Sequence, residues 1–290
     1  MSNANAHRYV IVANTDKCSI DDKWVEQFKP LGKGWLSKNK ACEIITRDPI
    51  EVPKDMAVDV FEVDPLDDNR KKMFLFCDMD STIVSEETLD RLALNLDPEV
   101  ARRIAEITDQ AMRGKLNYKD SLKKRVAELK GLKIEMLEEI ANDLPISKGA
   151  NTLIKTMKRN GAYCVLISGG FTHVTETLAN KLGFDEHHGN HLIVRDNTIQ
   201  GELSGKIQDG EEKGRIIRRV LARFGREEDQ AIAVGDGAND RFMMQYCNMG
   251  FAYYGKDILK EAARFQINHT DLTSLLYAQG FRDDEIVFCD

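Results

Sequence analysis

One stretch of the chain decides the fold, and it reads Phe74-Leu75-Phe76-Cys77-Asp78-Met79-Asp80-Ser81-Thr82-Ile83-Val84. Its first four residues are apolar strand formers on both sides of the pleat, which is typical of a strand buried on both faces of a parallel sheet. Two carboxylates follow at once, one residue apart. Because ligands bind beyond the carboxyl ends of such strands, Asp78 and Asp80 are candidate functional residues.

Composition limits the classes of protein to consider. The 290 residues suffice for two domains, and 42% hydrophobic with 31% charged residues is ordinary for a globular protein. The net charge of −7 argues against nucleic acid or an anionic membrane as the main partner. Six scattered cysteines without a CxxC pair indicate reduced thiols, and no stretch reads as a signal peptide or a membrane span. We therefore expect a cytoplasmic protein.

Residues 1–70 carry only short signals. Strands are expected at 9–13, 44–45 and 57–63 and a helix at 20–28, and the glycines and prolines between Pro30 and Pro53 are interpreted as connections. This pattern predicts a small α+β module, which could regulate by binding amino acids or could serve as a packing or dimerising appendage. Pro65 and the charged run 67–72 mark a boundary before a second domain, 71–290.

The second domain alternates strand and helix after a helical block. From about 86 to 145 the pattern is helical, and Asp97-Pro98-Glu99 and Asn117 are helix starts. We interpret this block as an inserted helical-bundle cap that serves as a lid. Strands at 163–167 and 231–234, a hairpin at 191–205 and helices at 147–160, 172–182, 211–224 and from 238 onward follow. The fold class is therefore α/β, with a doubly wound parallel sheet.

Three polar clusters follow three of these strands and should meet at one edge of the sheet. They are Asp78 to Thr82, Ser168-Gly169-Gly170 and Gly235-Asp236-Gly237-Ala238-Asn239-Asp240. Two buried carboxylates repel each other unless a cation or a shared proton is present, and Mg²⁺ accepts such oxygen ligands. With that ion bound, one carboxylate can attack phosphorus while the other handles the proton. Each cluster alone could be a solvated turn, and Lys213 an ordinary helix charge, but their conjunction favours chemistry.

These motifs, together with Lys213, resemble the four motifs of the haloacid dehalogenase superfamily. More narrowly, the chain is similar to the phosphoserine phosphatase family within it. That likeness depends on Glu87, nine residues after Asp78, on the runs 111–118 and 121–126, and on Phe171 after the glycine pair. It covers about 72 to 276. The N-terminal segment is similar to the family's amino-acid-binding extensions only faintly, and it is short, with fewer elements than a complete regulatory domain.

The resemblance implies a Mg²⁺-dependent phosphatase with a Rossmann-like core. It would hydrolyse O-phosphoserine to serine and phosphate, the last step of serine biosynthesis, through an aspartyl-phosphate. Asp78 would be the nucleophile and Asp80 the acid and base. Mg²⁺ would be held by Asp78, Asp236 and the Asp80 carbonyl, with Asp240 supporting. The phosphate would be bound by Ser168, Gly169, Lys213 and Asn239. In the cap, Glu87 would pair with the ammonium group of the substrate and Arg125 with its carboxylate, and the lid would be closed by Met112 and Tyr118.

Two other functions stay open. The same site could act on another small phosphomonoester or transfer the phosphoryl group to an alcohol, in which case Glu87 and Arg125 would lose their partners. Alternatively the chain could be a ligand-sensing or scaffolding protein with an inactive phosphatase domain, which the intact set of Asp78, Asp80, Lys213 and Asp236 opposes. A homodimer formed through the N-terminal module is a further expectation.

Overall fold

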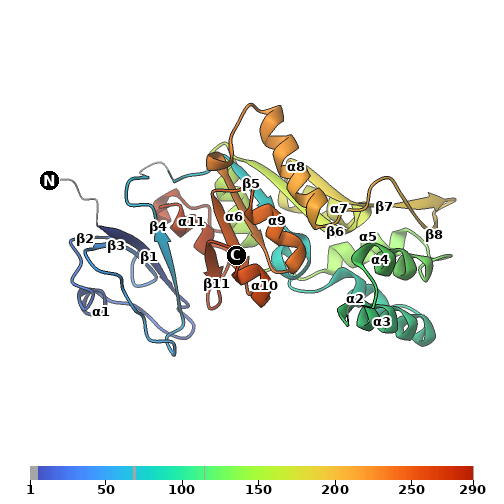
Figure 1. The fold of residues 1–290 in the computed structure, drawn as a ribbon, viewed down its shortest axis with the longest axis horizontal. Coiled ribbons are helices and arrows are strands. Elements are labelled where there is room, and N and C mark those ends of the chain that lie inside the picture. The colour runs from blue at the N-terminus through green and yellow to red at the C-terminus, as the bar shows by residue number, and fades with distance from the viewer. Residues whose placement is uncertain (1–5, 68–69, 114, 290) are drawn as a thin grey trace.

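A seven-stranded sheet forms the centre of the molecule (Figure 1), in a computed structural model that describes residues 6–67, 70–113 and 115–289. Its strand order is β11-β10-β9-β5-β6-β7-β8, and neighbours are parallel except for β8, which returns antiparallel to β7. The strands are β5 Phe74–Cys77, β6 Tyr163–Phe171, β7 Glu186–Arg195, β8 Thr198–Ser204, β9 Ala231–Gly235, β10 Met249–Tyr253 and β11 Phe265–Ile267.

Helices cover both faces of this sheet, because its strands are apolar on both sides. Leu75 and Cys77 share one cluster with α6 Ala150–Arg159, α7 Thr172–Leu182 and α11 Ser274–Ala278. Phe74 and Phe76 share the other with α8 Gly210–Arg223, α9 Arg241–Met244 and α10 Asp257–Lys260. The α/β class and the doubly wound sheet are thus confirmed.

The four α-helices that the described residues form between β5 and α6 make up a separate group, seen in teal and green in Figure 1. They are α2 Thr88–Ala93, α3 Pro98–Met112, α4 Tyr118–Ala127 and α5 Glu135–Asp143. The expected helix starts are confirmed, because the side chains of Asp97 and Asn117 accept hydrogen bonds from the amides of Glu99 and Asp120. Val84 and Ile146 pair where the chain enters and leaves this group, and α5 packs against α7. No helix of the described ranges is long and apolar enough to cross a bilayer.

The N-terminal segment forms its own antiparallel sheet, ordered β2-β3-β1-β4. Its elements are β1 His7–Ala13, α1 Asp22–Glu26, β2 Gly32–Ser37, β3 Ala41–Thr46 and β4 Val58–Val63. One face packs on α1 through Ile11 and Val25, and the other joins the core of the large sheet through Val10 and Phe61. The segment is therefore fastened to the rest of the molecule by a continuous apolar core.

Two sequence predictions need correction. The region around Gly32 and Gly34 was interpreted as a connection, but it is strand β2, which tolerates glycine because it lies at the edge of its sheet. The helix expected from Ala238 onward is a short 3₁₀ turn, Ala238–Asp240, followed by α9. Neither β10 nor β11 is predicted from the sequence, because Gly250 interrupts the apolar run of β10 and the three residues of β11 give little periodicity.

Candidate active site

A buried lysine joins two of the predicted clusters. Asp78 follows β5, where its amide donates to the carbonyl of Val234 at 3.0 Å, and the residue is only 4% exposed. Lys213 lies in the first turn of α8 and is fully buried. Its Nζ donates to Asp78 Oδ1 at 2.5 Å and to Asp240 Oδ1 at 2.7 Å. The ammonium group of Lys213 therefore pairs with two carboxylates that follow two adjacent strands, β5 and β9.

Asp236 completes an acidic cluster with Asp78 and Asp240. Carboxylate oxygens of the three residues all lie within 4.8 Å of one another. The other carboxylate oxygen of Asp240 accepts the amides of Asp236 at 3.1 Å and Gly237 at 3.0 Å. Glycine is required at 235, because a Cβ there would lie 2.5 Å from the Asp240 carboxyl group. The backbone after β9 thus wraps closely around Asp240 and aligns the cluster.

This cluster carries more negative charge than the two lysines beside it can balance. Three carboxylates with the ammonium groups of Lys213 and of Lys256, whose Nζ lies 3.5 Å from Asp236 Oδ2, give a formal charge of −1. Burial raises the pKa of Asp78 well above its ordinary range, and Asp240 adds to this effect while Lys213 opposes it. Burial likewise raises the pKa of Asp236, although Lys256 opposes it. The set is therefore suited to a hard divalent cation with oxygen ligands, such as Mg²⁺.

Asp80 is held by the first helix of the cap. The Thr88 amide donates to Asp80 Oδ1 at 2.8 Å, and the Thr88 hydroxyl makes a short bond to the same oxygen. Ser168 Oγ donates to Asp80 Oδ2 at 3.2 Å. Burial raises the pKa of Asp80 to about 6, while the bonds from Thr88 lower it. A carboxyl group with such a pKa can both give and take a proton near neutral pH.

The turn after β6 is fixed by several neighbours. Gly170 donates its amide to Ser168 Oγ at 2.8 Å, and Asn190 donates its side-chain amide to the carbonyls of Gly169 at 2.8 Å and Gly170 at 3.3 Å. Asn190 Oδ1 accepts the amide of Gln208 at 2.9 Å. Gly169 leaves room for the cap, because a Cβ there would lie 2.5 Å from the Tyr118 hydroxyl oxygen. These contacts fix the backbone conformation of Ser168-Gly169-Gly170, the segment that the sequence predicts to bind phosphate.

Side chains of the cap approach the same edge of the sheet. The Tyr118 hydroxyl donates to the carbonyls of Gly169 at 3.2 Å and Gln208 at 3.3 Å. Arg125 is half-buried, and its Nε is buried without a hydrogen-bond partner among the described residues. Burial lowers the pKa of Arg125, and the charges of Glu87 and Asp90 oppose this shift. The arrangement therefore leaves a buried guanidinium nitrogen of Arg125 with an unused capacity to donate a hydrogen bond.

The other predicted residues are less closely bound to the cluster. Glu87 is exposed, and its Oε1 accepts the Ser81 hydroxyl at 2.9 Å. Asn239 is half-buried in the turn that carries Asp240. Met112 ends α3, and its side chain lies outside the described ones. The structure thus brings the Asp78, Ser168 and Asp236 clusters and Lys213 to one edge of the large sheet, and Tyr118 is hydrogen-bonded to the turn at that edge.

Sequence reasoning did not single out Thr88, Asn190 or Gln208. Thr88 directly follows Glu87, which is a predicted site residue, and it begins α2. That position could have identified Thr88 as a neighbour of the site. Asn190 and Gln208 offered none, because their contacts arise only where β7 and the chain before α8 pass the turn after β6.

Comparison with known proteins agrees with this geometry. The family model described as haloacid dehalogenase-like hydrolase matches residues 75–245. A phosphoserine phosphatase of Archaeoglobus fulgidus is 37% identical over 71% of this chain, and the chain spans only 60% of that relative's length. A solved phosphoserine phosphatase described as a phospho-aspartyl intermediate analogue is 36% identical, with a TM-score of 0.64 over 71% of this chain and 98% of that one.

A third protein is similar along nearly the whole chain. The solved haloacid dehalogenase family hydrolase t0658 from Salmonella enterica serovar Typhi is 25% identical, with a TM-score of 0.82 over 97% of this chain and 99% of that one. Its match includes the N-terminal sheet as well as the seven-stranded core. Since the family model covers more than half of the residues and includes Asp78, Lys213 and Asp236, this chain belongs to the haloacid dehalogenase-like hydrolases.

Proposed function

We propose that this hydrolase cleaves O-phosphoserine to serine and phosphate with the help of Mg²⁺. The observation that carries the proposal is the convergence of Asp78, Lys213 and the acidic cluster at the carboxyl edge of the sheet. Relatives named phosphoserine phosphatase are similar over about 71% of the chain and support the choice of substrate.

Mg²⁺ would be held by Asp78, Asp236 and the backbone carbonyl of Asp80, with Asp240 supporting. The donor set fits, because it offers carboxylate oxygens of the buried Asp78 and Asp240 and of the half-buried Asp236, with an excess charge of −1 after Lys213 and Lys256 are counted. When bound, the ion would neutralise charge on the phosphoryl oxygens. Lys213 would then share its ammonium with the phosphoryl group, and Ser168, Gly169 and Asn239 would donate to its remaining oxygens.

The reaction would proceed in two displacements at phosphorus. A carboxylate oxygen of Asp78 forms a bond to phosphorus while the bond to the serine oxygen breaks, and Asp80 gives its proton to that oxygen. Asp80, now a carboxylate, takes a proton from water, whose oxygen attacks phosphorus and releases phosphate from Asp78. The pKa of about 6 at Asp80 supports both of its tasks.

Recognition of the amino-acid end would fall to the cap. Arg125 would pair its unpartnered Nε with the substrate carboxylate, and Glu87 would pair with the ammonium group. Tyr118 and Met112 would close over the substrate. We propose that residues 86–145 act as the lid, which is supported by the Tyr118 contacts and by the Lys119–Asp209 ion pair at 2.8 Å. Action on another small phosphomonoester, or transfer to an alcohol, remains the alternative.

A panel of phosphomonoesters tests this assignment. The full-length chain should release phosphate from phosphoserine faster than from phosphothreonine or sugar phosphates, and only with Mg²⁺ present. Arg125→Ala should raise KM for phosphoserine by about 10- to 100-fold, because a charge-assisted pair is lost, while its turnover of sugar phosphates stays the same. The matched control is Lys124→Ala, whose side chain is exposed on the same helix. Preference for a substrate without an amino-acid end refutes the assignment to phosphoserine.

We also propose the division into a module of residues 1–70 and a phosphatase core of residues 71–290, and a homodimer formed through the module. Strand β2 supports the dimer, because it ends its sheet and offers a free edge to a second copy. Sedimentation of the full-length chain tests it, and a monomer at micromolar concentration excludes it.

A further inference from the structure

The N-terminal sheet grips a loop of the catalytic core through one carboxylate. Asp59 lies on β4 and is 4% exposed. Its Oδ1 accepts the amide of Asn268 at 2.9 Å, and its Oδ2 accepts the amides of His269 at 3.2 Å and Thr270 at 2.9 Å. Oδ2 also accepts the Thr270 hydroxyl at 2.6 Å. A buried carboxylate with four donors fixes the backbone of those three residues strongly.

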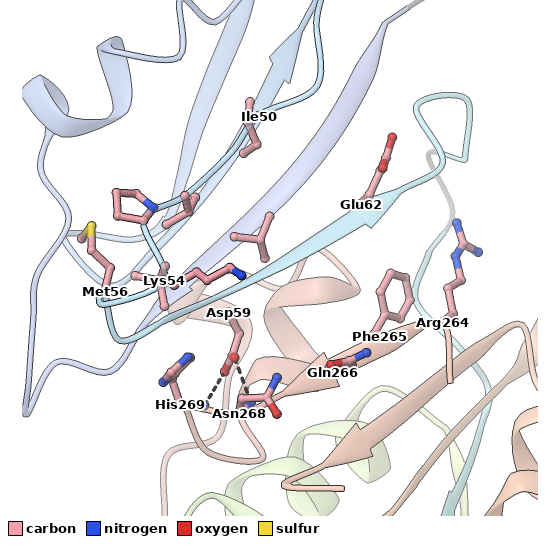
Figure 2. A pocket seen from close by; sticks show the side chains of 14 residues that line it. Ile50, Lys54, Met56, Asp59, Glu62, Arg264, Phe265, Gln266, Asn268 and His269 are labelled. Carbon is pink, nitrogen blue, oxygen red and sulfur yellow. Dashed lines mark hydrogen bonds between the residues drawn. The ribbon is translucent and has the colours of Figure 1, made fainter. Parts of the chain in front are cut away.

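This junction lies where the edge strands of the two sheets meet. β4 ends the small sheet and β11 ends the large one, and the loop 268–270 follows β11 directly. A groove of about 460 Å³, lined in part by Asp59, Asn268 and His269, lies beside the junction, and Figure 2 shows Asp59 reaching from β4 toward the other two residues. Asn14 adds a second tie from the small sheet, because its side-chain amide donates to the His269 carbonyl at 2.6 Å.

The gripped loop in turn holds the segment that follows β10. The Tyr254 hydroxyl donates to the carbonyl of Thr270 at 3.0 Å, and the Tyr254 amide donates to the carbonyl of Ile267 at 2.8 Å. Tyr254 has a φ of 44°, in the left-handed region that bulky side chains rarely adopt. Such a conformation persists only where its surroundings impose it, and these two bonds do so here.

The segment after Tyr254 contacts the acidic cluster. The Lys256 amide donates to the carbonyl of Asp236 at 2.9 Å, and Lys256 Nζ lies 3.5 Å from Asp236 Oδ2. A continuous series of contacts thus joins Asp59 to Asp236 through Thr270, Tyr254 and Lys256.

We propose that Asp59 is a positioning residue for the cation site, acting from the N-terminal sheet through this series of contacts. The inference rests on the proposed function, because it needs a divalent ion between Asp78 and Asp236. It gives the N-terminal module a task that requires neither a regulatory ligand nor a dimer. When Asp59 no longer holds the loop, Tyr254 relaxes from its left-handed conformation and the backbone of Asp236 loses an anchor. Binding of the ion must then also order the acidic cluster, and this lowers the affinity for the ion.

The test measures binding of Mn²⁺ to the full-length chain by the loss of its free-ion electron paramagnetic resonance signal. Asp59→Asn keeps the shape but places an amide where two acceptor oxygens are needed. It should weaken Mn²⁺ binding by about 2- to 30-fold, the range expected for a mutation along a coupling network. Tyr254→Phe removes only the hydroxyl and should act in the same direction. The double variant should lose no more than the larger single effect, because both changes break one series of contacts.

Glu62→Gln is the matched control. Glu62 lies on the same strand and beside the same groove, but it pairs with His7 at 2.7 Å rather than with the loop. Binding is measured well below the melting temperature of every variant, so that a merely structural role lowers stability without moving the affinity. Unchanged or tighter Mn²⁺ binding in Asp59→Asn and Tyr254→Phe overturns this inference alone. A full-length chain that binds no Mn²⁺ overturns the proposed cation site and the inference with it.

Discussion

Thr88 offers a sharp test of how the cap controls the proposed acid and base. Its hydroxyl and its amide both donate to Asp80 Oδ1, and the side chain is 2% exposed. Thr88→Val removes the hydroxyl but keeps the shape and the amide bond at 2.8 Å. A hydrogen bond to a charged acceptor contributes about 1.5–3 kcal/mol, which corresponds to about a 10- to 150-fold loss in rate if it orients Asp80 only in the reacting geometry.

The assay is steady-state release of phosphate from phosphoserine by the Thr88→Val variant, by the Thr88→Ser variant and by the unchanged chain. Thr88→Val should lower kcat by this factor with little change in KM, whereas Thr88→Ser, which keeps the hydroxyl, should recover most of the rate. Because the bond from Thr88 favours the charged carboxylate, its loss raises the pKa of Asp80 above about 6. The limb of kcat/KM that falls as Asp80 loses its proton should then move to higher pH. A kcat for Thr88→Val within twofold of the unchanged chain refutes the reasoning, provided that thermal unfolding shows an intact fold.

Three further predictions concern the acidic cluster and the apolar core that joins the two sheets. Asp78→Asn should abolish phosphate release while its circular dichroism spectrum stays the same, and near-normal turnover would contradict the assignment of the nucleophile. Lys213→Met leaves Asp78 and Asp240 buried without their shared cation and should cost about 3–5 kcal/mol of unfolding free energy at pH 7, measured by urea denaturation. Phe61→Ala should cost about 3–5 kcal/mol in the same assay, because its buried ring packs against Phe251 and Phe265 at centroid distances of 5.4 and 5.8 Å. A loss below 1 kcal/mol in either variant would show that these contacts contribute little.

The sequence predicted the central strands of the large sheet, although not β10 and β11, because the apolar pattern of β5 is easily recognised. Residues Phe74 to Cys77 are apolar on both sides of the pleat, and this pattern is typical of a strand covered on both faces. The convergence of Asp78, Ser168 and Asp236 followed from the rule that parallel strands end at one edge. Strand β2 was missed because glycine signals a turn and a tolerant edge strand alike.

The contacts that fix the site were harder to foresee. The bonds from Asn190 to Gly169 and Gly170 depend on the register between β6 and β7, which slips between Ile167 and Phe171. The grip of Asp59 on the loop 268–270 spans about two hundred residues of sequence and crosses from one sheet to another. Local periodicity carries no information about such pairs.

The apolar core that Val10 and Phe61 share with the large sheet has a mechanical consequence. A module joined by a flexible hinge can swing as a rigid body, but interdigitated side chains in a close-packed interior resist such rotation. A structural change in the N-terminal sheet can therefore reach the carboxylates only as displacements of fractions of an ångström, and not as a rotation of the whole module. The same continuity predicts one calorimetric peak on heating, with both sheets melting together.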